Sequence, residues 1–286
     1  MKRATGIIAM LLAAPAFADV PIAIAPTGHA TVPVKGGFGV KQFVLDTGAE
    51  GSAVYADFAE SAGLAVSGNV ALQGQTGAAD VPVIRLAELT LDGVRKAPVD
   101  AVKLPRRADG APLAGIVGLD LFGDRTLDFD LPRRRVALLA AGSRASDLRS
   151  QPLAASTTTG NLLTVPVTIG SVGATAVIDT GARKTRINWA LGRLLGLDPS
   201  RLSKGDTIQG ATNKPIETGS TRIADVRLGD RRLPDAPVLV ADLPVFETFG
   251  VADRPAIILG LDWLEQTRMV IDFPARKVWF EAAKPQ

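Results

Sequence analysis

Two aspartates occur in the same four-residue setting at two distant places in the sequence. Asp46 begins the run DTGA after the apolar residues FVL (43–45), and Asp179 begins an identical run after AVI (176–178). A carboxylate at the end of an apolar strand is partly removed from water, so it needs hydrogen bonds or a bound proton. If the fold brings the two carboxyl groups together, they share one proton, because adjacent carboxylates cannot both ionise cheaply. Such a pair can take a proton from water and give one to a carbonyl oxygen.

The residues that follow each aspartate suit this chemistry. Thr47 and Thr180 carry hydroxyl groups that can hydrogen-bond near the acids. Gly48 and Gly181 permit a tight turn and leave room for another backbone to approach.

Composition excludes most other hydrolytic chemistries. The 286 residues contain no cysteine and one histidine, His29. A thiol nucleophile, a disulfide framework and an HExxH metal site are therefore impossible, and we expect no metal or other cofactor.

The charge balance gives no reason to expect a nucleic-acid partner. The formal net charge of +3 falls to +1 once a predicted signal peptide, which holds two basic residues and no acid, is removed. The basic run RRR (133–135) has no interleaved aromatic residues, so we interpret it as a solvated hairpin end.

The N-terminus has the form of a secretory signal peptide. Lys2 and Arg3 precede the apolar stretch 7–14, and the small-x-small run AFA (16–18) precedes Asp19. We expect residues 1–18 to be removed and the protein to be exported, either to a bacterial periplasm or to the medium. No later segment is long and apolar enough to span a bilayer, so no membrane partner is expected.

The chain repeats itself. Residues 31–49 align without a gap with residues 164–182 at an offset of 133, and both stretches open on TVPV and close on DTGA. Three further matches follow at slowly growing offsets: 85–91 with 222–228, 115–122 with 257–264, and 127–129 with 271–273. This duplication predicts an N-terminal lobe over 19–140, a linker over 141–160 and a C-terminal lobe over 161–286.

Each copy has the pattern of a mainly-β domain. Short alternating or β-branched runs, separated by glycine and proline, predict strands. One helix is expected after each DTGA run, at 53–63 and at 188–196, and a short helical turn after each Gly-Leu-Asp. The run GGFG (36–39) has no helix after it and is predicted to be a hairpin turn rather than a phosphate loop.

On these motifs the sequence resembles the retropepsin-like aspartic proteases, which include retroviral proteases and their bacterial relatives, with pepsins as distant kin. Beyond the DTGA runs, the resemblance rests on an apolar-apolar-Gly run downstream of each, at 116–118 (IVG) and 258–260 (ILG). It covers nearly all of 31–140 and 164–281. It implies two tandem β-barrel lobes related by a pseudo-two-fold axis.

The resemblance also implies roles for matching residues. Asp46 and Asp179 would be the catalytic pair, while Thr47 and Thr180 would interlock by hydrogen bonds and Gly48 and Gly181 would contact the substrate backbone. Two glycine-containing segments lie where the family has its flaps, and we expect the substrate to contact Gly74, Gln75, Gly77, Gly210 and Ala211. Glu50 and Arg183 occupy equivalent places after the two DTGA runs, so we also hypothesise one acidic and one basic end of the substrate site.

The sequence departs from the family in several places. The pepsin flap tyrosine is absent, because the single tyrosine, Tyr55, lies soon after the first DTGA run. Retroviral proteases have arginine after the apolar-apolar-Gly run, where this chain has leucine and aspartate. Asp120 and Asp262 could cap the helical turns or serve the active site, and Asp128 with Asp130 resembles a metal-binding pair but is better explained as structural.

These observations predict a monomeric aspartic endopeptidase that acts on peptides or unfolded proteins at mildly acidic pH. Water would be activated by the Asp46 and Asp179 pair between the lobes. Two alternatives remain open from the sequence: a catalytically silent peptide-binding module of the same fold, and an enzyme whose lobes pair only in a homodimer.

Overall fold

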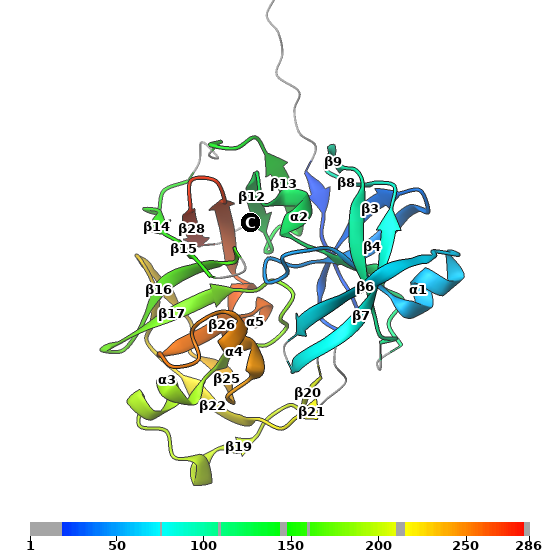
Figure 1. Cartoon of the computed structure of the whole chain (residues 1–286). Coiled ribbons are helices and arrows are strands. Elements are labelled where there is room, and N and C mark those ends of the chain that lie inside the picture. Colours follow the sequence, from blue (N-terminus) through cyan, green and yellow to red (C-terminus); the bar gives the residue numbers. More distant parts are fainter. Residues whose placement is uncertain are drawn as a thin grey trace, which may run out of the picture.

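The computed structural model describes residues 19–74, 76–107, 110–143, 148–158, 161–209 and 215–282. Within these ranges the two sequence copies form two β-rich lobes that lie side by side, and strands from both copies meet in a third sheet (Figure 1). This arrangement confirms the predicted fold class, a mainly-β protein with two tandem lobes.

The N-terminal lobe is built on one ten-stranded sheet. In spatial order its strands are β6 (Val66–Gly74), β7 (Gly77–Leu86), β10 (Val99–Leu104), β5 (Ala53–Tyr55), β11 (Gly115–Val117), β4 (Gly39–Leu45), β3 (Ala30–Gly36), β8 (Leu89–Leu91) and β9 (Val94–Lys96), with β2 (Ala23–Ile24) paired to β3. The β3–β4 hairpin closes with Gly36 opposite Gly39, as predicted, and Gly39 has a φ of +83°.

The C-terminal lobe repeats this sheet strand for strand. Its order is β19 (Ser203–Lys204), β22 (Gly219–Ile223), β25 (Ala236–Val240), β18 (Arg186–Ile187), β26 (Ala256–Leu259), β17 (Val172–Ile178), β16 (Leu163–Ile169), β23 (Val226–Leu228) and β24 (Arg231–Leu233), with β15 (Ser156–Thr157) paired to β16. A separate hairpin joins β20 (Ile208–Gln209) to β21 (Pro215–Ile216).

A six-stranded sheet ties the lobes together. Its order is β1 (Val20–Pro21), β13 (Arg135–Leu139), β12 (Thr126–Asp130), β27 (Thr267–Asp272), β28 (Lys277–Ala282) and β14 (Leu153–Ala154). The central pair, β12 with β27, joins one copy to the other in antiparallel register. The expected linker thus contributes two short strands, β14 and β15, because its backbone pairs with the edges of β28 and β16.

The core follows from strand alternation. Val32, Val34 and Leu45 from the first copy and Val165 and Ile178 from the second are all buried in one continuous cluster. The alternate residues of these strands point to the other face of each sheet. Their side chains form two smaller clusters, one in each lobe.

Helices are short and lie between strands. They are α1 (Ala56–Ser61), α2 (Leu119–Phe122), α3 (Trp189–Leu194), α4 (Pro244–Thr248) and α5 (Leu261–Leu264), with a 3₁₀ turn at Pro199–Arg201. The helices predicted at 53–63 and 188–196 were placed correctly but extended too far, since 53–55 is strand β5. No helix in the described ranges is long and apolar enough to cross a membrane.

Candidate active site

Both DTGA aspartates leave the central strands of their sheets at equivalent points. Asp46 follows β4, and its amide donates to the carbonyl of Val117 at 3.1 Å. Asp179 follows β17, and its amide donates to the carbonyl of Leu259 at 3.1 Å. Since β4–β11 and β17–β26 are parallel pairs, each DTGA turn rests beside the apolar-apolar-Gly run of its own copy.

The two threonines lock the turns to each other. The Thr47 amide donates to Oγ1 of Thr180 at 3.0 Å, and the Thr180 amide donates to Oγ1 of Thr47 at 3.1 Å. Each hydroxyl then donates across the interface, Thr47 to the carbonyl of Ile178 (2.9 Å) and Thr180 to that of Leu45 (2.7 Å). These four buried bonds fix the relative position of the aspartates, because every atom involved lies within two residues of one of them.

Each aspartate packs on the glycine of the opposite copy. A Cβ built on Gly48 would lie 2.6 Å from Cγ of Asp179, and one built on Gly181 would lie 2.2 Å from Oδ2 of Asp46. Glycine is required here for close approach and not for an unusual φ, since neither residue has a positive φ.

The carboxyl groups of Asp46 and Asp179 interact with each other, and their pKa values are raised. For Asp46 burial is the largest cause, the charge of Asp179 adds to it, and the pKa lies well above the ordinary value. Burial also raises the pKa of Asp179, while the charge of Arg186 opposes the rise. Backbone amides hold the pair in place, Gly48 donating to Oδ1 of Asp46 at 2.8 Å and Ala182 to Oδ1 of Asp179 at 2.9 Å.

Asp120 and Asp262 each accept a hydrogen bond from the segment that follows one DTGA run. In the first copy, the Ser52 hydroxyl donates to Oδ1 of Asp120 at 2.7 Å and accepts the Gly118 amide at 3.3 Å. In the second copy, Thr185 makes the equivalent bonds to Asp262 (2.8 Å) and Gly260 (3.0 Å).

Neither aspartate side chain caps its helical turn, so the capping alternative is wrong. The reason is that each carboxylate bonds to the residue just before β5 or β18, six positions after Asp46 or Asp179. Ser52 and Thr185 were missed from the sequence, although their equivalent places in the repeat were visible.

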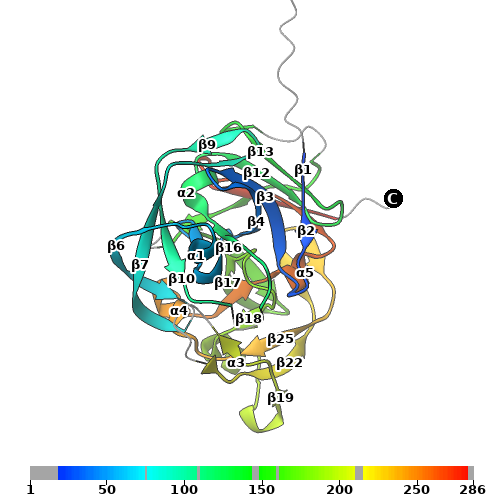
Figure 2. The ribbon, with the colours of Figure 1, turned by 90° about the vertical axis from the view of Figure 1, so that its right-hand side faces the viewer.

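The first-copy flap segment forms a regular hairpin. Gly74 and Gly77 face each other at its tip, between β6 and β7, and Thr76 is buried. Leu72 packs on the small cluster that contains Val44 and Ala53, and β6 contacts α4 of the other lobe, as Figures 1 and 2 show. The hairpin therefore reaches from one lobe to the other.

The second-copy flap segment is organised differently. The short β20–β21 hairpin occupies its place, and β19 rather than a long strand pairs with β22. Gln75, Gly210 and Ala211, which we predicted as substrate contacts, lie outside the described residues, as does the predicted signal peptide 1–18.

Glu50 and Arg183 each approach residues of the opposite copy. Glu50 is exposed and lines a cavity of about 510 Å³ between the lobes, together with Asn161 and Arg276. Arg183 is also exposed, and its guanidinium donates to the carbonyl of Thr27 at 3.0 Å. Each of these charges therefore faces the opposite copy.

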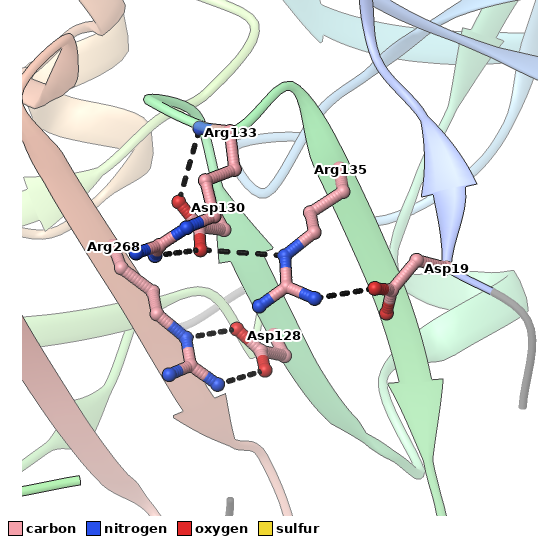
Figure 3. Close-up of polar contacts among 6 residues, drawn as sticks. All are labelled: Asp19, Asp128, Asp130, Arg133, Arg135 and Arg268. Atoms are coloured by element: carbon pink, nitrogen blue, oxygen red, sulfur yellow. Dashed lines mark hydrogen bonds and ion pairs between the residues drawn. The ribbon is translucent and has the colours of Figure 1, made fainter. Parts of the chain in front are cut away.

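Asp128 and Asp130 belong to a charge network on the six-stranded sheet, drawn in Figure 3. Arg268 donates to both oxygens of Asp128, with Nε at 2.8 Å from Oδ1, and this ion pair joins the two copies. Asp130 accepts from Arg133 and Arg135. The structural explanation of these acids is confirmed. Within the described ranges, no group of three or more His, Cys, Asp or Glu side chains is arranged to hold a metal ion.

One residue of the site was missed because the repeat breaks there. Arg186 is buried and its charge acts on Asp179, whereas the equivalent residue of the first copy is Ala53. The contrast between the two copies could have revealed it, because the second copy has a cation, Arg186, where the first has a methyl group, Ala53.

The comparisons agree with the geometry. No curated protein matched the chain. A family model described as aspartyl protease matches it twice, over residues 30–121 and 165–263. The two matches together cover more than half of the chain, and each contains one DTGA run and one apolar-apolar-Gly run. The chain therefore belongs to the aspartyl protease family.

Proposed function

We propose that the protein is an aspartic endopeptidase in which Asp46 and Asp179 form one composite catalytic pair. The observation that carries this proposal is the threonine interlock of the two turns, with each carboxyl group packed against the glycine of the opposite copy. The pKa of each carboxyl group is raised as well. Two carboxyl groups that share a proton offer a base and an acid at the same place. Because the threonine interlock forms within one chain, the geometry supports pairing in cis over the homodimer alternative.

The reaction follows from this arrangement. The ionised carboxylate removes a proton from water, and the water oxygen bonds to the peptide carbonyl carbon. The protonated carboxyl group donates its proton to the carbonyl oxygen, which gives a tetrahedral diol. A proton then passes to the amide nitrogen, the carbon–nitrogen bond breaks, and a carboxylic acid and an amine are released.

The β6–β7 hairpin is our candidate for the moving flap. Asp179 is 5% exposed and Asp46 is partly exposed, and the hairpin joins the first lobe to α4 of the second. Most β6 side chains are exposed, so few apolar contacts hold the hairpin in place. We propose that it lifts to admit an extended peptide and closes over it, with Gly74 and Gly77 at the moving tip. Glu50 and Arg183 remain our candidates for the two ends of the substrate site.

The test is cleavage of a denatured-protein digest, read by mass spectrometry between about pH 4 and 7. Wild type should cleave, and Asp46→Asn and Asp179→Asn should each abolish cleavage because each removes half of the pair. Cleavage that survives either substitution contradicts the composite pair. Peptides retained but not cleaved by wild type would favour a binding module.

We further propose that the protein is exported and acts as a monomer. Mass spectrometry of protein secreted from a host should give Asp19 as the first residue. Size analysis of active fractions should give the mass of a single chain. Activity that falls on dilution would instead indicate pairing between chains.

A further inference from the structure

Arg186 is a buried cation with no counterpart in the other half of the molecule. Its side chain is 5% exposed, and its Nε donates to the carbonyl of Lys184 at 3.2 Å. The repeat places Ala53 at the equivalent position, where the side chain is a single methyl group. The two halves of the carboxyl pair therefore differ in charge although their backbones match.

Strand register shows on which side of the sheet this cation lies. Arg186 pairs with Leu239 on β25 and with Ile258 on β26, and Ile258 pairs with Val177 on β17. These three partners form part of the smaller cluster of the second lobe, whereas Ile187, the next residue, points into the main core. Val177 precedes Asp179 by two residues, so Arg186 shares the face of the sheet from which Asp179 emerges.

Both acidic and basic side chains act on Arg186. Asp179 exerts the largest electrostatic effect on it, followed by Asp262, Arg183 and Asp46. The strands packed on either side, β25 and β26, carry no charged residue, and the charged residue of α4, Glu247, is exposed. Burial lowers the pKa of Arg186, but a guanidinium ordinarily ionises so far above neutrality that it stays protonated near neutral pH.

We infer that Arg186 is a positioning residue that makes the carboxyl pair unequal, holding Asp179 as the carboxylate and leaving the shared proton on Asp46. This inference rests on the proposed function and assigns the two roles within it. Asp179 takes the proton from water, and Asp46 protonates the carbonyl oxygen. Two equal carboxyl groups could exchange these roles, whereas a single cation on one side favours one assignment.

Carbon-13 NMR of aspartate carboxyl groups tests the inference without requiring turnover. In wild type, the Asp179 carboxyl group should ionise at a lower pH than that of Asp46, with assignments from the two asparagine variants. In Arg186→Gln the difference should shrink, and Asp179 should ionise at least about one pH unit higher, because an adjacent opposite charge lowers a carboxyl pKa by about one to three units. Arg186→Lys should restore the wild-type order.

The controls separate charge from folding. Arg193→Met removes an exposed arginine from α3 of the same lobe and should leave both titrations unchanged. If Arg186→Gln does not fold, the order in which the two carboxyl groups ionise in wild type still tests the inference. Ionisation of Asp46 before Asp179 would overturn it. An unchanged Asp179 titration in a folded Arg186→Gln protein would overturn it as well.

Kinetics provide a second readout that a merely structural residue would not change. The acid limb of kcat/KM, which reports ionisation of the base, should move to higher pH in Arg186→Gln by the same amount as the NMR titration. It should return in Arg186→Lys. A wild type without peptidase activity would refute the proposed function, yet the order of the NMR titrations would still test the inequality.

Discussion

Gly181→Ala tests the apposition of the two aspartates with the smallest possible change. The new Cβ would lie 2.2 Å from Oδ2 of Asp46, whereas ordinary van der Waals contact begins at 3.4 Å. The carboxyl group must therefore retreat by about 1.2 Å, since the backbones on both sides are fixed by the threonine interlock. Displacement on this scale moves the Asp46 carboxyl group out of its position beside the second DTGA turn.

We expect kcat/KM to fall by about a hundredfold, because a misplacement of about 1 Å costs roughly that factor. This corresponds to about 2.7 kcal/mol of activation free energy. Gly48→Ala should have a smaller effect, since its Cβ would lie 2.6 Å from Cγ of Asp179. Neither glycine has a positive φ, so backbone strain adds nothing to either variant.

The assay is cleavage of a fluorogenic peptide derived from the best-cut sequence of the digest, together with thermal unfolding. Gly173→Ala is the matched control. Gly173 lies on β17, the strand that leads to Asp179, and a Cβ added there would meet open space. It should retain wild-type kcat/KM. A folded Gly181→Ala protein within threefold of wild-type kcat/KM would refute the close packing on which the proposed pair depends.

Three further predictions concern stability. Because burial raises the pKa of Asp46 above 3.8, its ionisation opposes folding as pH rises, so Asp46→Asn should raise the unfolding temperature at pH 7 by a few degrees. That gain should disappear below about pH 4, where the wild-type carboxyl group is protonated; a gain independent of pH would argue against a raised pKa. Thr47→Val keeps the side-chain shape but leaves the amide of Thr180 and the carbonyl of Ile178 without these partners. Urea denaturation should show that the free energy of unfolding falls by about 2–4 kcal/mol. Thr47→Ser should stay close to wild type. Arg268→Met leaves Asp128, whose side chain is 13% exposed, without this partner and should cost about 3 kcal/mol in the same assay. A loss under about 1 kcal/mol would mean that water reaches Asp128 and that the pair contributes little.

The sequence alone determined the architecture of each lobe and the location of the chemistry. Strand patterns with a period of two and breaks at glycine or proline are local features. They can therefore be recognised without knowing the partner strand. The duplication then implied that whatever sheet one copy forms the other forms too, and the strand orders do match. The DTGA runs were recognisable because a charged residue at the end of a buried strand is costly without a partner.

Only the tertiary structure decided how the copies join and how the acids are held. The β12–β27 pairing and the Arg268–Asp128 ion pair connect residues 140 positions apart in the chain, and no local period records such a contact. Helix ends were missed for a similar reason, because residues 53–55 extend the sheet by pairing with β10 and β11.

The support by Ser52 and Thr185 and the one-sided charge of Arg186 show the same limit at the site itself. A serine, a threonine or an arginine is compatible with many surroundings, and its role depends on which side chains the fold places within hydrogen-bonding distance. Sequence periodicity reports which face of a strand is buried, but not what lies opposite that face. The inequality of Asp46 and Asp179 is therefore a property of packing, since it arises from a cation that the fold buries beside one of two otherwise equivalent turns.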